Sequence, residues 1–308
     1  MKIAIMGAGG VGGFYGARMA RAGEDVTFIA RGAHLKAMRT GGLRVLSESQ
    51  GDFALPRVRA TGDPTTVGEV DLVWMTHKAY DLERAAGAIG PIIGGETVVI
   101  PLLNGLDNAE RIGAVVGMEH MMGGIVQMSA AVAEPGVIRH NSGDRFVIGE
   151  LQGGKSPRAE RIAKMLNDAG IPAILSEDIR KDIWNKYLNL TASAGICALT
   201  RQTMDRVLAD ADTRALFVSC MREVEALARE SGVALDADVC EQVLSRYSGA
   251  AKGVKPSMAL DLERGKRLEL EVFQGTAVRL GERLGVPTPI NRCIYAALKP
   301  HAHGPPAE

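Results

Sequence analysis

The stretch KIAIMGAGGVGG, Lys2 to Gly13, decides the fold of the N-terminal half of the chain. It begins as a short apolar strand, runs into a glycine loop, and is followed at once by a helical pattern from Phe14. In a strand–turn–helix of this kind, Gly7 permits the tight turn, Gly9 lets a pyrophosphate approach the backbone, and Gly12 lets the helix pack on the strand. The helix N-terminus then faces the phosphates. The stretch predicts a dinucleotide site that opens a Rossmann-type domain; the alternative is a tight turn that binds nothing.

The residue after the second predicted strand indicates which dinucleotide is bound. The strand Val26–Ala30 ends at Arg31, where an NAD-binding domain would carry an Asp or Glu for the ribose 2′-hydroxyl. A guanidinium can instead pair with a 2′-phosphate, which a carboxylate would repel. Arg31 therefore favours NADPH over NADH, against the alternative that it is an ordinary exposed loop arginine.

Strands and helices continue to alternate along the first half of the chain. Residues 71–76 and 97–102 are apolar and short enough to be buried strands, and an Ala-rich helical pattern covers residues 80–89 between them. This βαβ alternation predicts a parallel sheet with ligands bound outside the carboxyl ends of its strands. The strand-like segments between residues 119 and 150 are expected to extend that sheet.

The second half of the chain has apolar residues at helical spacing, for example Leu216 and Cys220. We therefore predict an α/β protein in which an N-terminal Rossmann-type doubly wound sheet is followed by an all-α domain. The NADP-binding domain is expected over residues 1–176, the helical substrate and catalytic domain over 177–300, and a disordered tail over 301–308.

Composition excludes several classes of function. The 36 basic and 36 acidic residues balance, and no basic run is interleaved with aromatic residues, so a nucleic-acid partner is not expected. The four cysteines are widely spaced and form no CxxC pair, which argues against a zinc site and a disulfide framework, and no metal is expected. No stretch has the length of a membrane span or the form of a signal peptide. These features predict a cytoplasmic protein that acts on a small molecule.

Several segments together resemble the ketopantoate reductase family, whose members use NADPH to reduce 2-dehydropantoate, a 2-oxo acid, to pantoate in pantothenate biosynthesis. The resemblance covers nearly the whole chain. Besides the glycine loop and Arg31, the matching segments are Thr76–Tyr80, Asn104-Gly105, Glu134–Gly136, Ile183–Lys186 and Pro256–Gly265.

The resemblance implies a role for individual residues. Lys186 would act as the general acid, and Glu269 would contact both this lysine and the nicotinamide ribose. Asn104 would bridge cofactor and substrate, Lys78 would contact a cofactor phosphate, and Ser257 would help to bind the substrate. The implied cofactor-binding set is Gly7, Ala8, Gly9, Gly10, Val11, Gly12, Arg31, Lys78, Asn104, Ala130 and Glu269, and the implied substrate-binding set is Asn104, Lys186, Asn189 and Ser257.

The chain departs from the family pattern on the helix that carries Lys186. The family usually has asparagines four and eight residues after the lysine, where this chain has Leu190 and Ala194. Asn189 is turned by about 100° from position 190 and can replace the missing amide only in part. A more apolar pocket would bind a hydroxylated substrate less well, because recognition of a hydroxyl needs polar partners.

Two other functions therefore stay open. One is a D-2-hydroxy acid dehydrogenase of the same fold that acts on a less polar, branched or aromatic 2-oxo acid. The other belongs to a different class, a non-catalytic protein that senses NADP(H) and would have no need of Lys186 and Glu269. The helical half is also a candidate surface for a homodimer.

Overall fold

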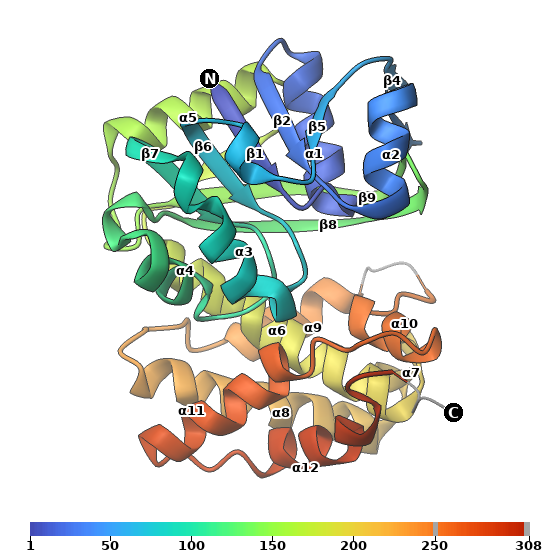
Figure 1. Ribbon diagram of the computed structural model, residues 1–308. Helices are drawn as coiled ribbons and strands as arrows, with labels where there is room; N and C mark the ends of the chain where they lie inside the picture. Colours follow the sequence, from blue (N-terminus) through green and yellow to red (C-terminus); the bar gives the residue numbers. More distant parts are fainter. Residues whose placement is uncertain (249–251, 305–308) are drawn as a thin grey trace. The chain divides into compact units, whose positions relative to one another are not determined.

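The computed structural model describes residues 1–248 and 252–304 (Figure 1). It forms two compact units, each built on its own apolar core. The first unit comprises residues 1–103 and 107–180, and the second comprises residues 104–106 and 181–308.

A parallel sheet forms the centre of the first unit. Its strands are β1 (Lys2–Met6), β2 (Asp25–Ile29), β5 (Arg59–Thr61), β6 (Val70–Met75) and β7 (Ile93–Pro101). They lie in the order β5-β2-β1-β6-β7, and every neighbouring pair is parallel. Because the order runs outward from β1 in both directions, this is a doubly wound sheet, as the βαβ alternation of the sequence predicted.

Helices and short 3-10 turns lie between these strands and after the last of them. They are α1 (Gly10–Arg21), α2 (Gly32–Gly41), η1 (Pro64–Thr66), η2 (Ala79–Asp81), α3 (Leu82–Ile89), η3 (Gly90–Ile92), α4 (Asn108–Val116) and η4 (Met118–His120). A further helix, α5 (Pro157–Asp168), begins at Ser156, whose hydroxyl caps the N–H of Ala159.

The strands after residue 119 form a second sheet, so the expectation that they extend the parallel sheet is wrong. This sheet contains β3 (Leu43–Ser47), β4 (Phe53–Leu55), β8 (Gly123–Glu134), β9 (Val137–Gly149) and β10 (Ala173–Leu175). One edge of β9 pairs with β8, and its other edge pairs with β3 and β10, so β9 has no edge left for the first sheet. Periodicity identified the strands but carries no information about their partners.

Helix α1 is packed between the two sheets and contacts strands of both (Figure 1). Every residue from Gly12 to Met19 is buried. A Cβ at Gly16 would lie 2.6 Å from the ring of Phe28 in the first sheet, and one at Gly13 would lie 2.6 Å from the Ile138 side chain in the second. The helix fits between the sheets because it has glycine where each sheet approaches it this closely.

The second unit is helical, as predicted. Its elements are α6 (Ile179–Thr200), α7 (Met204–Ala209), α8 (Ala211–Glu230), α9 (Val239–Ser248), α10 (Ser257–Glu263), the π-helical turn η5 (Glu271–Gly275), α11 (Thr276–Leu284), α12 (Pro289–Leu298) and η6 (Lys299–His301). Helix α6 is central to the core, because every residue from Thr191 to Ala198 is buried.

The predicted disordered tail is wrong for its first residues. Residues 299–301 form η6, and the buried Ala302 accepts a hydrogen bond from the Leu268 N–H at 2.9 Å. This contact holds the chain end on the helical core, whereas residues 305–308 lie outside the described part of the chain. Within the described residues, no helix is long and apolar enough to cross a membrane.

Candidate active site

Backbone hydrogen bonds hold the glycine loop between β1 and α1. Gly7 has a φ of +111°, and its N–H donates to the Ile29 carbonyl at 3.1 Å. Its own carbonyl accepts from the Thr76 hydroxyl at 2.7 Å. A Cβ on Gly7 would lie 2.7 Å from the backbone nitrogen of His77, so both the conformation and the close approach require glycine.

The other glycines of the loop differ in what surrounds them. A Cβ on Gly12 would collide with the Thr76 side chain, and one on Gly10 with the Ala130 carbonyl. A Cβ on Gly9 would meet nothing within 4 Å. Gly9 is also the N-cap of α1 and provides no side-chain cap. The loop thus leaves open space beside a helix N-terminus whose first N–H groups suit an anion, which fits a bound pyrophosphate.

The other predicted cofactor residues of the first unit lie near strand ends. Arg31 is exposed and is the N-cap of α2, and one residue separates it from the end of β2. Lys78 is half-buried after β6, and its carbonyl accepts a hydrogen bond from His77 Nδ1 at 2.9 Å. Burial lowers the pKa of His77, because it disfavours the charged imidazolium. Ala8 and Val11 direct their side chains to the core, so only their backbone is left for a ligand.

In the second unit, helix α6 carries Lys186. The residue is partly exposed, but its ammonium group is surrounded by protein. Burial lowers the pKa of Lys186 to about 8, and the negative charge of Glu269 partly opposes this shift. Glu269 is only 3% exposed. A buried carboxylate thus acts on the charge of a partly exposed lysine.

Asn104 belongs to the same group of residues. It lies in the short segment 104–106 that clusters with the second unit, and the Gly105 beside it has a φ of +132°. Asn104 Nδ2 donates to Glu269 Oε2 at 3.4 Å. The structure therefore brings together Lys186, Glu269 and Asn104, three residues far apart in the sequence.

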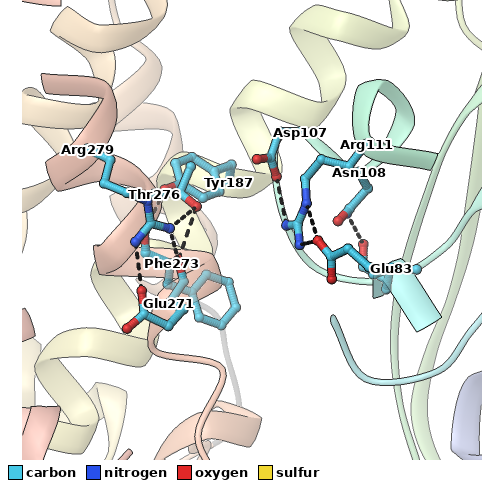
Figure 2. Close-up of polar contacts among 10 residues, drawn as sticks. Glu83, Asp107, Asn108, Arg111, Tyr187, Glu271, Phe273, Thr276 and Arg279 are labelled. Atoms are coloured by element: carbon cyan, nitrogen blue, oxygen red, sulfur yellow. Dashed lines mark hydrogen bonds and ion pairs between the residues drawn. The ribbon is translucent and has the colours of Figure 1, made fainter. Parts of the chain in front are cut away.

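Hydrogen bonds in the first unit hold the two ends of the segment that contains Asn104 (Figure 2). Asn108 Nδ2 donates to the Leu103 carbonyl at 3.3 Å. Arg111 forms ion pairs with Asp107 at 3.5 Å and with Glu83. Because the Asn108–Leu103 bond joins the residues on either side of 104–106, the chain leaves and re-enters the first unit at defined points.

The remaining predicted substrate residues have other surroundings. Ser257 is exposed and is the first residue of α10. Asn189 Oδ1 accepts a hydrogen bond from the Tyr247 hydroxyl at 2.8 Å, a partner that no sequence signal indicated. Leu190 packs against the helical core and Ala194 is buried within it. The side chains that replace the usual asparagines are therefore apolar packing groups.

Two buried side chains that link elements of the second unit could not have been recognised as structurally important from the sequence. Tyr187 and Gln274 are buried, and each donates a hydrogen bond to a backbone carbonyl of another element. Both residue types also occur as ordinary core or surface residues, so nothing in their local sequence marks them.

Comparison with known proteins agrees with this architecture. A model of the family described as ketopantoate reductase PanE/ApbA matches residues 3–153, and its C-terminal counterpart matches residues 178–302. The 2-dehydropantoate 2-reductase of Mesorhizobium japonicum is 33% identical over 320 residues, which cover 97% of each chain.

Solved structures are similar over the same length. A PanE/ApbA family ketopantoate reductase from Ralstonia eutropha has a TM-score of 0.90 at 33% identity and 98% coverage of both chains. A D-mandelate dehydrogenase in complex with NADH has a TM-score of 0.85 at 25% identity, with 97% of this chain and 98% of that chain covered. The chain therefore belongs to the ketopantoate reductase family of oxidoreductases.

Proposed function

We propose that this chain reduces a 2-oxo acid to the corresponding 2-hydroxy acid, with NADPH as hydride donor and Lys186 as proton donor. The observation that carries the proposal is the grouping of Lys186, Glu269 and Asn104 in the second unit. Relatives named 2-dehydropantoate 2-reductase make 2-dehydropantoate the first substrate to test.

Carbonyl reduction adds a hydride to carbon and a proton to oxygen. NADPH supplies the hydride when it is bound. Negative charge builds on the oxygen, where an ammonium group can stabilise it and then donate its proton. With a pKa of about 8, Lys186 is protonated at neutral pH yet acidic enough to transfer that proton. Glu269 favours the charged form of Lys186, and the Asn104 amide orients the Glu269 carboxylate.

Residues of the first unit support the choice of a phosphorylated dinucleotide. Gly9 leaves open space beside the N-terminus of α1 for a pyrophosphate, and Arg31 is exposed where the 2′-phosphate of NADPH would lie in this fold. The D-mandelate dehydrogenase neighbour binds NADH, so comparison of the two cofactors is part of the test.

Substitution of the proton donor tests the proposal. We expect wild type to oxidise NADPH when 2-dehydropantoate or another 2-oxo acid is added. Lys186→Met should lower kcat by at least about a thousandfold, while fluorescence titration should show NADPH binding unchanged. Normal turnover by the Lys186→Met variant would contradict the assignment.

A second candidate substrate class is favoured by one feature of α6. Leu190 and Ala194 offer no hydrogen-bond partner to a substrate hydroxyl, and the chain is similar to a D-mandelate dehydrogenase. This supports a branched or aromatic 2-oxo acid as the preferred substrate. A kcat/KM for 2-dehydropantoate at least tenfold above that for such acids would rule out this candidate. If a branched or aromatic 2-oxo acid is preferred, Leu190→Asn should raise the kcat/KM for 2-dehydropantoate relative to that acid. Leu190→Ala is the control, because it adds no amide.

A further inference from the structure

A buried hydrogen bond joins helix α6 to the π-helical turn η5. The Tyr187 hydroxyl donates to the Phe273 carbonyl at 2.6 Å (Figure 2). Tyr187 and Phe273 are 3% and 2% exposed, so water cannot replace this bond. Tyr187 directly follows Lys186 along α6, and η5 begins two residues after Glu269. The bond therefore connects the helix that carries the ammonium to the turn that follows the carboxylate residue.

A second buried bond joins the same two elements further along α6. Gln274 is fully buried, and its Nε2 donates to the Thr191 carbonyl at 2.6 Å. A Cβ on Gly195 would collide with the Gln274 amide, so this glycine provides the space that the amide fills. Tyr187, Thr191 and Gly195 follow at intervals of four residues and form one ridge of α6.

The backbone of η5 connects these bonds to Glu269. The N–H groups of Val272 and Phe273 donate to the Glu269 carbonyl at 3.1 and 3.2 Å. The backbone of Phe273 is thus joined to Tyr187 through its carbonyl oxygen and to the Glu269 carbonyl through its N–H. The Gly275 N–H donates to the Leu270 carbonyl at 3.0 Å, which is the wide turn of a π-helix, a form often found at functional sites.

We propose that Tyr187 and Gln274 are positioning residues that hold the Glu269 carboxylate beside the Lys186 ammonium. Neither is needed to touch substrate or cofactor, because each acts by fixing η5 on α6. The catalytic part of this inference rests on the proposed function, whereas the effect on Lys186 does not. Coulombic stabilisation of a buried ammonium falls when its counter-charge moves away, so a loosened η5 makes Lys186 more acidic.

Tyr187→Phe tests the inference because it removes one hydroxyl and little volume. We expect kcat to fall about tenfold with KM for the 2-oxo acid nearly unchanged, since the Glu269 carboxylate that supports the proton donor is displaced while the groups that bind the substrate stay in place. The pH at which reduction declines should move lower by about half a unit or more. Tyr295→Phe is the matched control, because the Tyr295 hydroxyl contacts the same turn at the exposed Glu271 side chain, 2.7 Å away.

A measurement without cofactor separates this inference from the proposed function. Competitive labelling with acetic anhydride, followed by mass spectrometry, reports the fraction of Lys186 that is deprotonated at each pH. We expect the labelling midpoint of the apoprotein to be lower in Tyr187→Phe than in wild type and Tyr295→Phe. If the midpoint shifts but wild type reduces no 2-oxo acid, the positioning role of Tyr187 is supported and the proposed reductase function is refuted. Active wild type with an unchanged midpoint in Tyr187→Phe would overturn the positioning.

Two further variants keep the inference testable if Tyr187→Phe does not fold. Gln274→Met keeps the size of the side chain but removes its donor, and Gly195→Ala pushes the amide out of its space. Both should lower the labelling midpoint. Gly87→Ala on α3 is the control, because a Cβ there meets nothing within 4 Å. Equal midpoints in all of these variants would refute the inference.

Discussion

At Lys186, two opposing effects set the acidity of the ammonium group. Burial disfavours the charge and lowers the pKa to about 8, while Glu269 favours the charge and limits the shift. An exposed lysine would have a pKa near 10.4 and would be a poor acid at neutral pH. The local environment therefore gives an ordinary residue type the acidity that a proton donor needs.

The pH profile of turnover follows from this acidity. The proton donor must be charged, so kcat for reduction should be constant below about pH 7 and fall as pH rises through about 8. Oxidation of the 2-hydroxy acid needs the neutral amine and should rise over the same range. Glu269→Gln removes the charge that favours the ammonium, so the fall in the reduction rate should move to lower pH. Steady-state rates in both directions check this, and a decline only near pH 10 would contradict it.

Under the proposed function, Arg31 would select the cofactor by pairing with its 2′-phosphate. We expect Arg31→Ala to raise the KM for NADPH about 10- to 100-fold, the loss associated with a charge-assisted hydrogen bond. The KM for NADH should change by less than about threefold, because NADH has no 2′-phosphate. Lys36→Ala, an exposed cation on the same helix α2, is the control. Equal effects on the two cofactors would show that Arg31 does not read the phosphate.

At the scale of elements, α1 must both pack between two sheets and leave space for a ligand at its N-terminus, and different glycines meet these two requirements. Gly12, Gly13 and Gly16 let the helix fit between two sheets, and Gly9 leaves space at the helix N-terminus. Helix α6 has the same property, because Gly195 admits a side chain from η5. In both helices a glycine leaves the space into which a neighbouring group packs.

Alanine substitutions in α1 should separate folding from cofactor binding. Gly9 has a φ of −74°, which alanine tolerates, so Gly9→Ala should change stability by less than about 0.5 kcal/mol but weaken cofactor binding about tenfold or more. Gly12→Ala should destabilise the fold by about 1–3 kcal/mol, because its Cβ meets backbone and packed side chains. Urea unfolding and cofactor titration measure the two effects, and the opposite pattern would contradict this division.

At the scale of the whole molecule, the chain has two separate cores, one in each unit. The proposed cofactor residues are divided between the units: the glycine loop and Arg31 belong to the first, and Asn104 and Glu269 to the second. The polypeptide crosses between the units at residues 104–106 and again at 180–181. Asn104 thus reaches the helical unit although it follows a strand of the parallel sheet.

Cofactor binding should raise the thermal stability of the first unit. NADPH at 100 times its Kd should stabilise the folded state by about 2.7 kcal/mol through mass action. Scanning calorimetry should show a higher Tm with NADPH than with NADH at equal concentration. Gly9→Ala should lose most of this increase, and an equal increase with both cofactors would indicate that the 2′-phosphate is not recognised.

The sequence alone determined the α/β class, the parallel sheet that starts at β1 and the helical second half, because strand and helix periods and glycine requirements are local properties of the chain. Resemblance to the family indicated Lys186, Glu269 and Asn104 as site residues, whose roles stay predictions. The second sheet and the ordered residues 301–304 were not foreseen, since both depend on partners far away in the chain.

Only the tertiary structure decided how acidic Lys186 is and what holds its counter-charge. Burial, the Glu269 charge and the bonds from Tyr187 and Gln274 join residues that are 80 or more positions apart. A local sequence pattern cannot encode such contacts, because they form only when separate helices pack on one core. The residue types needed for the chemistry were therefore visible in the chain, and their mutual placement was a product of folding.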